Sequence, residues 1–157
     1  MAVEIRRAGT DDVAVVADVR LAFLAEEHGD VMVGADDGFA DQVRGFVERA
    51  THEGRWWSWL AEDGARVVGG LSMLVQEVPP HPRDPRSLDG FVFNVWVAPR
   101  HRRAGVGRRL VDACLDVART DGLRRVALVA TDAGRHLYES VGFTPDADLL
   151  RVRVPPT

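Results

Sequence analysis

One segment of the chain carries residues of the types that bind phosphate. Residues 95–110 read VWVAPRHRRAGVGRRL, so an apolar strand leads through Gly105 and Gly107 into a helix. The first N–H groups of a helix have no intrahelical partners, and the helix dipole adds positive charge at that end. Five arginines fall within ten residues of this segment, at positions 100, 102, 103, 108 and 109. The pattern predicts a phosphate or pyrophosphate site at the turn.

Two other interpretations of this segment compete with phosphate binding. The two glycines could form only a tight turn, and the arginines could be only a solvated surface. A dinucleotide-binding fold would need a third glycine at position 110, which is Leu, and would place the turn after the first strand of a βαβ array. Because a strand precedes this turn and a helix follows it, the segment favours phosphate binding outside that fold.

Length and composition limit the class of protein. The 157 residues are 46% hydrophobic and 28% charged, which is typical of one globular domain spanning 1–157. No apolar run approaches a membrane span, and the N-terminal residues lack a signal-peptide core, so we expect a cytoplasmic protein without a membrane partner. One cysteine excludes an internal disulfide and a Cys-rich zinc site, and we expect no metal. The absence of lysine excludes a P-loop lysine and a Schiff-base lysine.

Charge is distributed unevenly along the chain. Residues 1–90 carry a net charge of −8, whereas residues 91–157 carry +4. A basic half in an acidic protein predicts a local anionic ligand rather than a nucleic-acid surface.

Hydrophobic periodicity predicts the elements that position the glycine turn. We expect helices at 10–28, 37–49, 105–121 and 132–140, and strands at 3–6, 55–61, 66–75, 91–97, 125–130, Phe143 and 149–154. Asp63 and Gly64 indicate a hairpin, and four prolines in residues 79–85 indicate an exposed loop. The order β-α-α-β-β-β-α-β-α-β-β predicts an α/β fold of mixed α+β type. Its mixed central sheet would carry helices on both faces.

Two motifs in this chain resemble the signatures of the GNAT superfamily of N-acetyltransferases. Residues 102–107 (RRAGVG) match its [Q/R]-x-x-G-x-[G/A] motif, and residues 95–99 match the strand that precedes it. Residues 137–143 (LYESVGF) resemble a second signature, a helix carrying L-Y-E-x-x-G-F. The order and separation of the motifs also fit, and the likeness covers essentially the whole chain. The resemblance implies a GNAT-like sheet that is splayed beside the turn.

The resemblance implies acetyl-CoA as cosubstrate. The N–H groups from Arg103 to Arg108 would hold the pyrophosphate, and the edge of the strand at 95–97 would bind the pantetheine arm. One backbone N–H of this strand acts as an oxyanion donor in the family, and we assign that role to Val97. The cofactor-binding residues implied are Val95, Trp96, Val97, Arg102, Arg103, Ala104, Gly105, Val106, Gly107, Arg108 and Thr131.

The resemblance also implies a general acid. The departing thiolate has a conjugate-acid pKa of about 8.5, so a phenol within hydrogen-bond reach can protonate it. Tyr138 is the only tyrosine of the chain and stands at the family's position for this acid. The alternative is a packed helix residue whose hydroxyl is merely hydrogen-bonded.

The general base stays open at this point. Many family members place a glutamate on the strand before the turn, but residues 91–96 (FVFNVW) contain no carboxylate, and Asn94 cannot take a proton at neutral pH. An acceptor of low pKa needs no base. The candidates, acting through water, are Glu26, Glu27 and Glu77, with His28 and His81 as weaker ones.

Three further features have a structural and a functional interpretation. Arg20 falls on the apolar face of its helix, which favours a structural arginine reaching solvent over a substrate contact. Cys114 favours a core residue over a nucleophile. The tryptophans at 56, 57 and 59 predict a core with one exposed ring, the alternative being an aromatic wall beside an acceptor pocket.

The sequence therefore predicts an N-acetyltransferase that moves an acetyl group from acetyl-CoA to a primary amine by direct attack in a ternary complex. The acceptor would be a small molecule or a peptide, and the acidic first half favours a cationic one. The alternative is a non-catalytic acyl-CoA-binding regulatory module of the same fold. One Ile, one Asn and no Lys favour a GC-rich bacterial source. The acyl group and the oligomeric state stay open, although a homodimer is common in the family.

Overall fold

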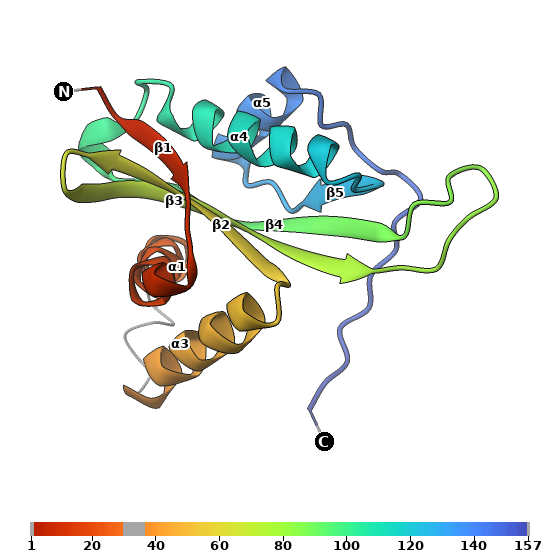
Figure 1. The fold of residues 1–157 in the computed structure, drawn as a ribbon, viewed down its shortest axis with the longest axis horizontal. Coiled ribbons are helices and arrows are strands. Elements are labelled where there is room, and N and C mark those ends of the chain that lie inside the picture. Colours follow the sequence, from red (N-terminus) through yellow and green to blue (C-terminus); the bar gives the residue numbers. More distant parts are fainter. Residues whose placement is uncertain (1, 30–36, 157) are drawn as a thin grey trace.

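A single mixed sheet organises the chain. The computed structural model describes residues 2–29 and 37–156. Five strands lie in the order β1-β2-β3-β4-β5 (Figure 1). The first four pair antiparallel, and β4 pairs with β5 in parallel. Their bounds are Glu4–Arg7 (β1), Trp56–Asp63 (β2), Arg66–Glu77 (β3), Leu88–Val97 (β4) and Arg125–Leu128 (β5).

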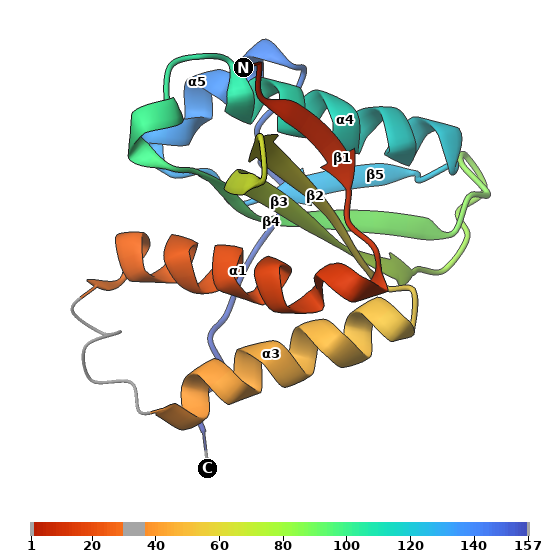
Figure 2. The same cartoon turned by 60° about the vertical axis from the view of Figure 1, so that its left-hand side comes forward.

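Helices cover both faces of this sheet, as the sequence predicts. Helices α4 and α5 lie on one face, and α1 and α3 lie on the other (Figure 2). Short 3-10 turns precede α1 and follow β4. The helix bounds are Val13–Glu27 (α1), Asp37–His52 (α3), Val106–Thr120 (α4) and Asp132–Ser140 (α5).

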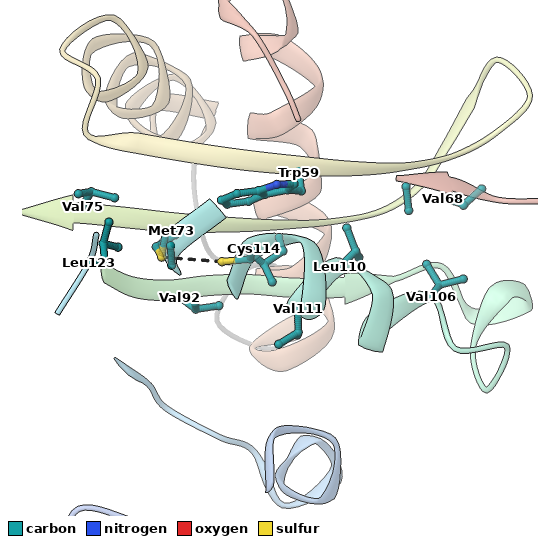
Figure 3. Packing of buried hydrophobic residues seen from close by; sticks show 13 residues of the cluster. Trp59, Val68, Met73, Val75, Val92, Val106, Leu110, Val111, Cys114 and Leu123 are labelled. Carbon is teal, nitrogen blue, oxygen red and sulfur yellow. Dashed lines mark hydrogen bonds between the residues drawn. The ribbon is translucent and has the colours of Figure 1, made fainter. Parts of the chain in front are cut away.

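Two apolar cores result, one on each face. Between the sheet and α4, the buried face of the helix packs on β2, β3 and β4 (Figure 3). Cys114 lies in this core, where its Sγ is 3.8 Å from Sδ of Met73 and burial raises its pKa to about 12. A thiol in this state is not a nucleophile, so Cys114 is a core residue.

The second core lies between the sheet and the pair α1 and α3, and it receives Trp56. The Trp56 ring contacts Phe46 edge-on at 5.1 Å and Phe93 at 5.6 Å. Trp59 is buried on the opposite face, and Arg7 stacks over half-buried Trp57 at 4.6 Å. None of the three tryptophans has an exposed ring, so that expectation is wrong. Helices cover both faces of the sheet, so strand side chains that point to either face are shielded from solvent.

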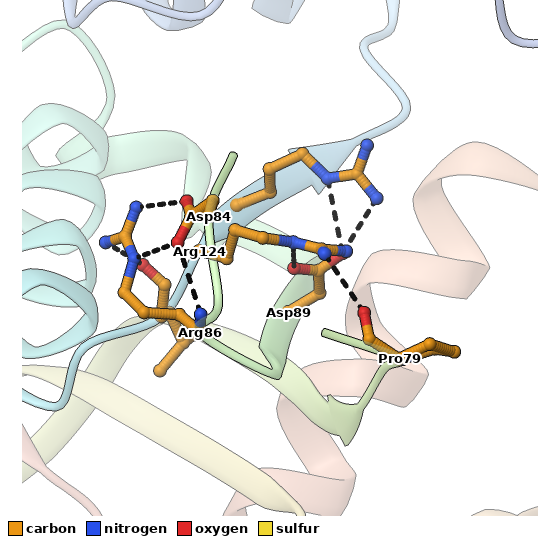
Figure 4. Close-up of polar contacts among 7 residues, drawn as sticks. Pro79, Asp84, Arg86, Asp89 and Arg124 are labelled. Atoms are coloured by element: carbon orange, nitrogen blue, oxygen red, sulfur yellow. Dashed lines mark hydrogen bonds and ion pairs between the residues drawn. The ribbon is translucent and has the colours of Figure 1, made fainter. Parts of the chain in front are cut away.

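The proline-rich loop between β3 and β4 is held by arginines. Asp89 is buried at the start of β4 and accepts hydrogen bonds from Arg124 and Arg125 (Figure 4). Burial acts to raise the pKa of Asp89, but these hydrogen bonds outweigh it and lower that pKa. Arg124 also donates to the Pro79 carbonyl at 3.3 Å, and Arg86 bridges Asp84 and the Leu123 carbonyl. These contacts hold the loop against the N-terminal end of β4.

The two strands expected at Phe143 and 149–154 are not formed. Phe143 packs against Tyr138 with ring centroids 5.9 Å apart. Residues 149–154 (LLRVRV) alternate like a strand, yet they pair with no strand among the described residues, and Leu150, Val152 and Val154 are 86–90% exposed. Alternation gives a segment the propensity for a strand, but a strand also needs a partner for its N–H and C=O groups. In the described chain β5 is therefore an edge of the sheet.

A carboxylate at the start of α1 links strand, turn and helix. Asp12 accepts hydrogen bonds from the Gly9 N–H at 2.7 Å and from the Arg6 guanidinium at 2.7 and 2.8 Å. The Arg6 contact in the first place lowers the pKa of Asp12 from 3.8 to about 2. A lowered pKa means that this carboxylate stabilises the fold above about pH 4, and that its contribution is lost as the pH falls toward 2.

Asp12→Asn should therefore reduce the free energy of unfolding at pH 7 by about 1 kcal/mol. Urea denaturation at pH 7 and at pH 2.5 measures the effect, and the difference between wild type and variant should shrink at the lower pH. Asp11→Asn is the matched control, because the Asp11 side chain is exposed and makes no hydrogen bond or ion pair with the described residues. Equal stability of the two variants at pH 7 would contradict the role given to Asp12.

Candidate active site

A cavity of about 900 Å³ opens where β4 and β5 separate. The two strands pair only over Asp89–Val92 and Arg125–Leu128. Beyond Val92, the edge of β4 has no strand partner on the β5 side among the described residues. The cavity is bounded by this free edge, the end of α1, the glycine turn and α5. The splayed sheet that the family resemblance implies is thus present.

A bulge in β4 reorients the strand beside the cavity. Ser72 pairs with Phe93 and Gly70 pairs with Trp96, so β4 holds one extra residue over this stretch. Asn94 lies in the bulge with a left-handed φ of 58°. The Ala98 N–H bonds to the Val68 carbonyl on β3 at 2.8 Å. Since N–H directions alternate along a strand, the N–H of Val97 points away from β3, toward the cavity side.

The glycine turn presents a row of free N–H donors. The backbone N–H groups from Arg103 to Arg108 have no hydrogen-bond partner in the described part of the chain, and α4 begins within this row. Gly105 has a φ of 77° and Arg103 a φ of 60°, left-handed values that bend the chain tightly into the helix. Such a row at a helix N-terminus can hold an anion.

The residues predicted from the sequence converge on this cavity. Of the predicted cofactor-binding residues, Ala104 is the one that does not line it; the others do, including Thr131, whose hydroxyl also caps α5. Tyr138 lines the cavity from α5. Burial in the first place, and the charge of Glu27 in the second, raise the pKa of Tyr138 to about 12. Its hydroxyl is therefore protonated at neutral pH.

The candidate bases separate into two groups. Glu26, Glu27 and His28 line the cavity, whereas Glu77 and His81 do not. Glu77 lies at the far end of β3, opposite Leu88, and His81 lies in the proline loop, so the structure does not bring either of them to the cavity.

Glu26 and Glu27 differ in their partners. Glu26 accepts a hydrogen bond from Trp96 Nε1 at 3.1 Å and pairs with Arg102 at 2.5 Å. Arg102 in turn donates through Nε to the Val97 carbonyl at 2.9 Å. Glu27 has no ion pair among the described residues, and its charge acts on Tyr138. Of the two, Glu27 is the carboxylate left available for proton transfer.

Several lining residues were not predicted from the sequence. Phe23 and Glu27 stand one helical turn apart on α1 and both face the cavity, a spacing that could have identified Phe23. His101 also lines the cavity, and its Nε2 lies 3.1 Å from Asp63 of the β2–β3 hairpin. That contact joins residues 38 positions apart and leaves no local signal.

Comparison with known families identifies this architecture. A family model described as "Acetyltransferase (GNAT) family" matches residues 18–143. The chain belongs to the GNAT acetyltransferase family. The matched residues include both motifs and the cavity-lining parts of α1, so the match covers the whole candidate site.

Curated relatives of this GNAT chain are named as acetyltransferases. N-acetyltransferase family 8 member 2 of Rattus norvegicus is 34% identical over 54% of this chain and 37% of its own. Glucosamine 6-phosphate N-acetyltransferase of Trypanosoma brucei brucei is 32% identical over 50% and 51%. Mycothiol acetyltransferase of Beutenbergia cavernae is 29% identical over 83% and 46%. The chain thus spans about half or less of these relatives.

Solved structures share the GNAT fold over nearly the full chain. A predicted acetyltransferase from Clostridium acetobutylicum, solved with acetyl-CoA, superposes with a TM-score of 0.82 at 18% identity, covering 97% of this chain and 96% of that one. A GCN5-related N-acetyltransferase from Ralstonia eutropha gives 0.78 at 27% identity, covering 97% and 99%. In the described ranges of our chain, no helix has the length and apolar character that crossing a bilayer requires.

Proposed function

We propose that this chain transfers an acetyl group from acetyl-CoA to a primary amine by direct attack in a ternary complex. The observation that carries the proposal is the row of free N–H groups from Arg103 to Arg108, which opens on the same cavity as Tyr138. The row supports an anion-binding role, and the tyrosine supports acid chemistry beside it.

The cavity suits a long, phosphate-bearing thioester. The free N–H groups and the helix dipole would hold the pyrophosphate. The unpaired edge of β4 at 95–97 offers backbone groups to the amides of the pantetheine arm. The N–H of Val97 would then donate to the thioester carbonyl oxygen as negative charge develops there.

Glu27 and Tyr138, at the other side of the cavity, would carry out the proton transfers. The acceptor must attack as a neutral amine, and Glu27 can take its proton directly or through water. Tyr138 would donate its hydroxyl proton to the sulfur as the carbon–sulfur bond breaks. Because the pKa of Tyr138 is about 12, the phenol still carries its proton when the carbon–sulfur bond breaks. Burial that raises the pKa of the phenol would also raise that of the thiol formed beside it, which would favour the proton transfer.

Consumption of acetyl-CoA, followed by release of free thiol, tests the proposal across a panel of primary amines. Acetylation of at least one amine, with a matching mass increase of 42 Da in that amine, is the expected result. Binding of CoA without turnover on any amine would instead favour the regulatory module, which the absence of a carboxylate from residues 91–96 supports.

The absence of lysine makes a second result predictable. The chain has no lysine, so its N-terminal amine is the expected internal acceptor. After long incubation with acetyl-CoA, intact-mass measurement should find at most one amine-stable acetyl group per chain. The control is a variant with lysine at one exposed position, such as Arg66→Lys, which shows whether one molecule acetylates a lysine of another. Two or more stable additions to the wild type would contradict the expectation.

A further inference from the structure

Arg20 holds a positive charge close to the cavity. It lies half-buried on α1, and its Nη1 donates to Oδ1 of Asn94 at 2.6 Å. Its guanidinium carbon is 5.8 Å from the centroid of the Phe93 ring. No ion pair of Arg20 is found among the described side chains, and burial lowers its pKa. Buried charges are ordinarily paired, because desolvation is costly.

Asn94 is the neutral partner of this charge and is itself incompletely bonded. It is 2% exposed, and its Nδ2 has no hydrogen-bond partner in the described part of the chain. The bond from Arg20 occupies the carboxamide oxygen, so the amide nitrogen is the group left to donate. An unsatisfied buried donor is destabilising unless a ligand completes it.

Both partners of Arg20 belong to the cavity wall. Phe93 and Asn94 line the cavity, together with Phe23, which lies one turn further along α1 from Arg20. At the bulge of β4 the cavity wall therefore has the amide of Asn94, with the charge of Arg20 behind it. The carboxylate end of the cavity is at Glu27, two helical turns from Arg20 and beside Tyr138.

We propose that Asn94, with the charge of Arg20 behind it, forms a subsite for a carboxylate carried by the amine acceptor. The inference rests on the proposed acetyl transfer and names its substrate class. The amine would lie near Glu27 and Tyr138, and the carboxylate would accept from the Asn94 amide. Arg20, which holds Asn94, and Glu27 lie two turns apart on α1, about 10 Å along its axis, which favours an amine and a carboxylate several bonds apart. The local charge thus opposes the purely cationic acceptor that the acidic first half of the chain suggests.

Matched pairs of acceptors test this subsite. Glycine, β-alanine, γ-aminobutyrate and δ-aminovalerate are each compared with the corresponding amide, which keeps the amine and removes the negative charge. The wild type should use the best carboxylate at least about tenfold better in kcat/KM than its amide, because a charge-assisted hydrogen bond is lost in the amide.

Two variants separate charge from packing. Arg20→Gln can keep a donor toward Asn94 but removes the charge, so the preference should fall to near unity while KM for acetyl-CoA is unchanged. Asn94→Asp replaces the free donor with a carboxylate that pairs with Arg20. This variant should also lose the preference, and its melting temperature should rise rather than fall.

A binding measurement keeps the subsite testable without turnover. In the presence of CoA, γ-aminobutyrate should raise the melting temperature of the wild type more than its amide does at equal ionic strength, and Arg20→Gln should abolish the difference. Equal use and equal binding of carboxylates and amides by the wild type would overturn the subsite. So would a preference that survives in Arg20→Gln. Failure of acetyl transfer to every amine would overturn the proposed function, and the melting experiment would still decide the subsite.

Discussion

Tyr138→Phe should lower the turnover rate about 10²–10⁴-fold, the usual contribution of a positioned general acid. The substitution removes only the hydroxyl. The ring, which packs edge-on against Phe143 at 5.9 Å, stays in place. Stability and KM for acetyl-CoA should therefore change little. Loss of turnover without loss of binding is the signature of an interaction made in the transition state.

The pH dependence offers a second measurement of the same group. Burial and the charge of Glu27 raise the pKa of Tyr138 from 10 to about 12. The acid must be protonated to act, so a raised pKa extends the pH range of activity upward. Ionisation of Tyr138 should therefore cause no decline in the wild-type rate up to about pH 10. The free energy of unfolding should fall above pH 10, because the tyrosine of the unfolded chain ionises at a lower pH than that of the folded chain.

The control for Tyr138→Phe is His136→Asn, which changes another side chain of α5 at the cavity. It should keep near-normal turnover. Single-turnover kinetics with the best acceptor isolate the chemical step. If Tyr138→Phe keeps more than about half of the wild-type rate there, the hydroxyl is not the acid, and Tyr138 is a packed residue beside the thioester.

Gly107→Glu should abolish detectable binding of CoA. A Cβ at this position would lie 3.4 Å from Leu137 Cδ2 and 3.9 Å from Val97 Cγ2, both residues of the cavity wall. Because Gly107 lines the cavity, a longer side chain would extend into the space proposed for the cofactor. It also brings a negative charge to the row of N–H donors that would hold the pyrophosphate.

Calorimetry with CoA measures this effect. We expect micromolar binding by the wild type, about −8 kcal/mol. Gly107→Ala is the matched control, because both distances from its Cβ are ordinary van der Waals contacts. It should retain binding within about tenfold. Failure of the wild type to bind CoA, or normal binding by the glutamate variant, would remove the basis for the phosphate site.

The sequence predicted the glycine turn well because its geometry is local. A strand, two glycines and a helix start within sixteen residues dictate where free N–H groups collect. The helices and the first five strands followed from periodicity for the same reason. The separation of β4 from β5 came only from the family resemblance, since no period in the sequence encodes where two strands part.

The remaining features depend on contacts between distant residues. The left-handed Asn94 and its bond from Arg20 join positions 74 apart, and the Glu26–Arg102 pair joins positions 76 apart. The C-terminal strands failed for a related reason. The alternation in 149–154 describes the segment alone, whereas strand formation depends on an available partner. Whether 1–157 folds as one independent domain stays a prediction.

The Glu26–Arg102 ion pair would couple binding at the glycine turn to binding beside α1. It ties the end of α1, on the proposed acceptor side, to a residue of the glycine turn. An anion that draws Arg102 away from Glu26 releases that helix end. By reciprocity, whatever an acceptor does to the position of Glu26 changes the affinity for the anion by the same factor. If acetyl-CoA and the amine bind as proposed, they would share one coupled equilibrium, and the dissociation constant of either would be defined only at a stated occupancy of the other.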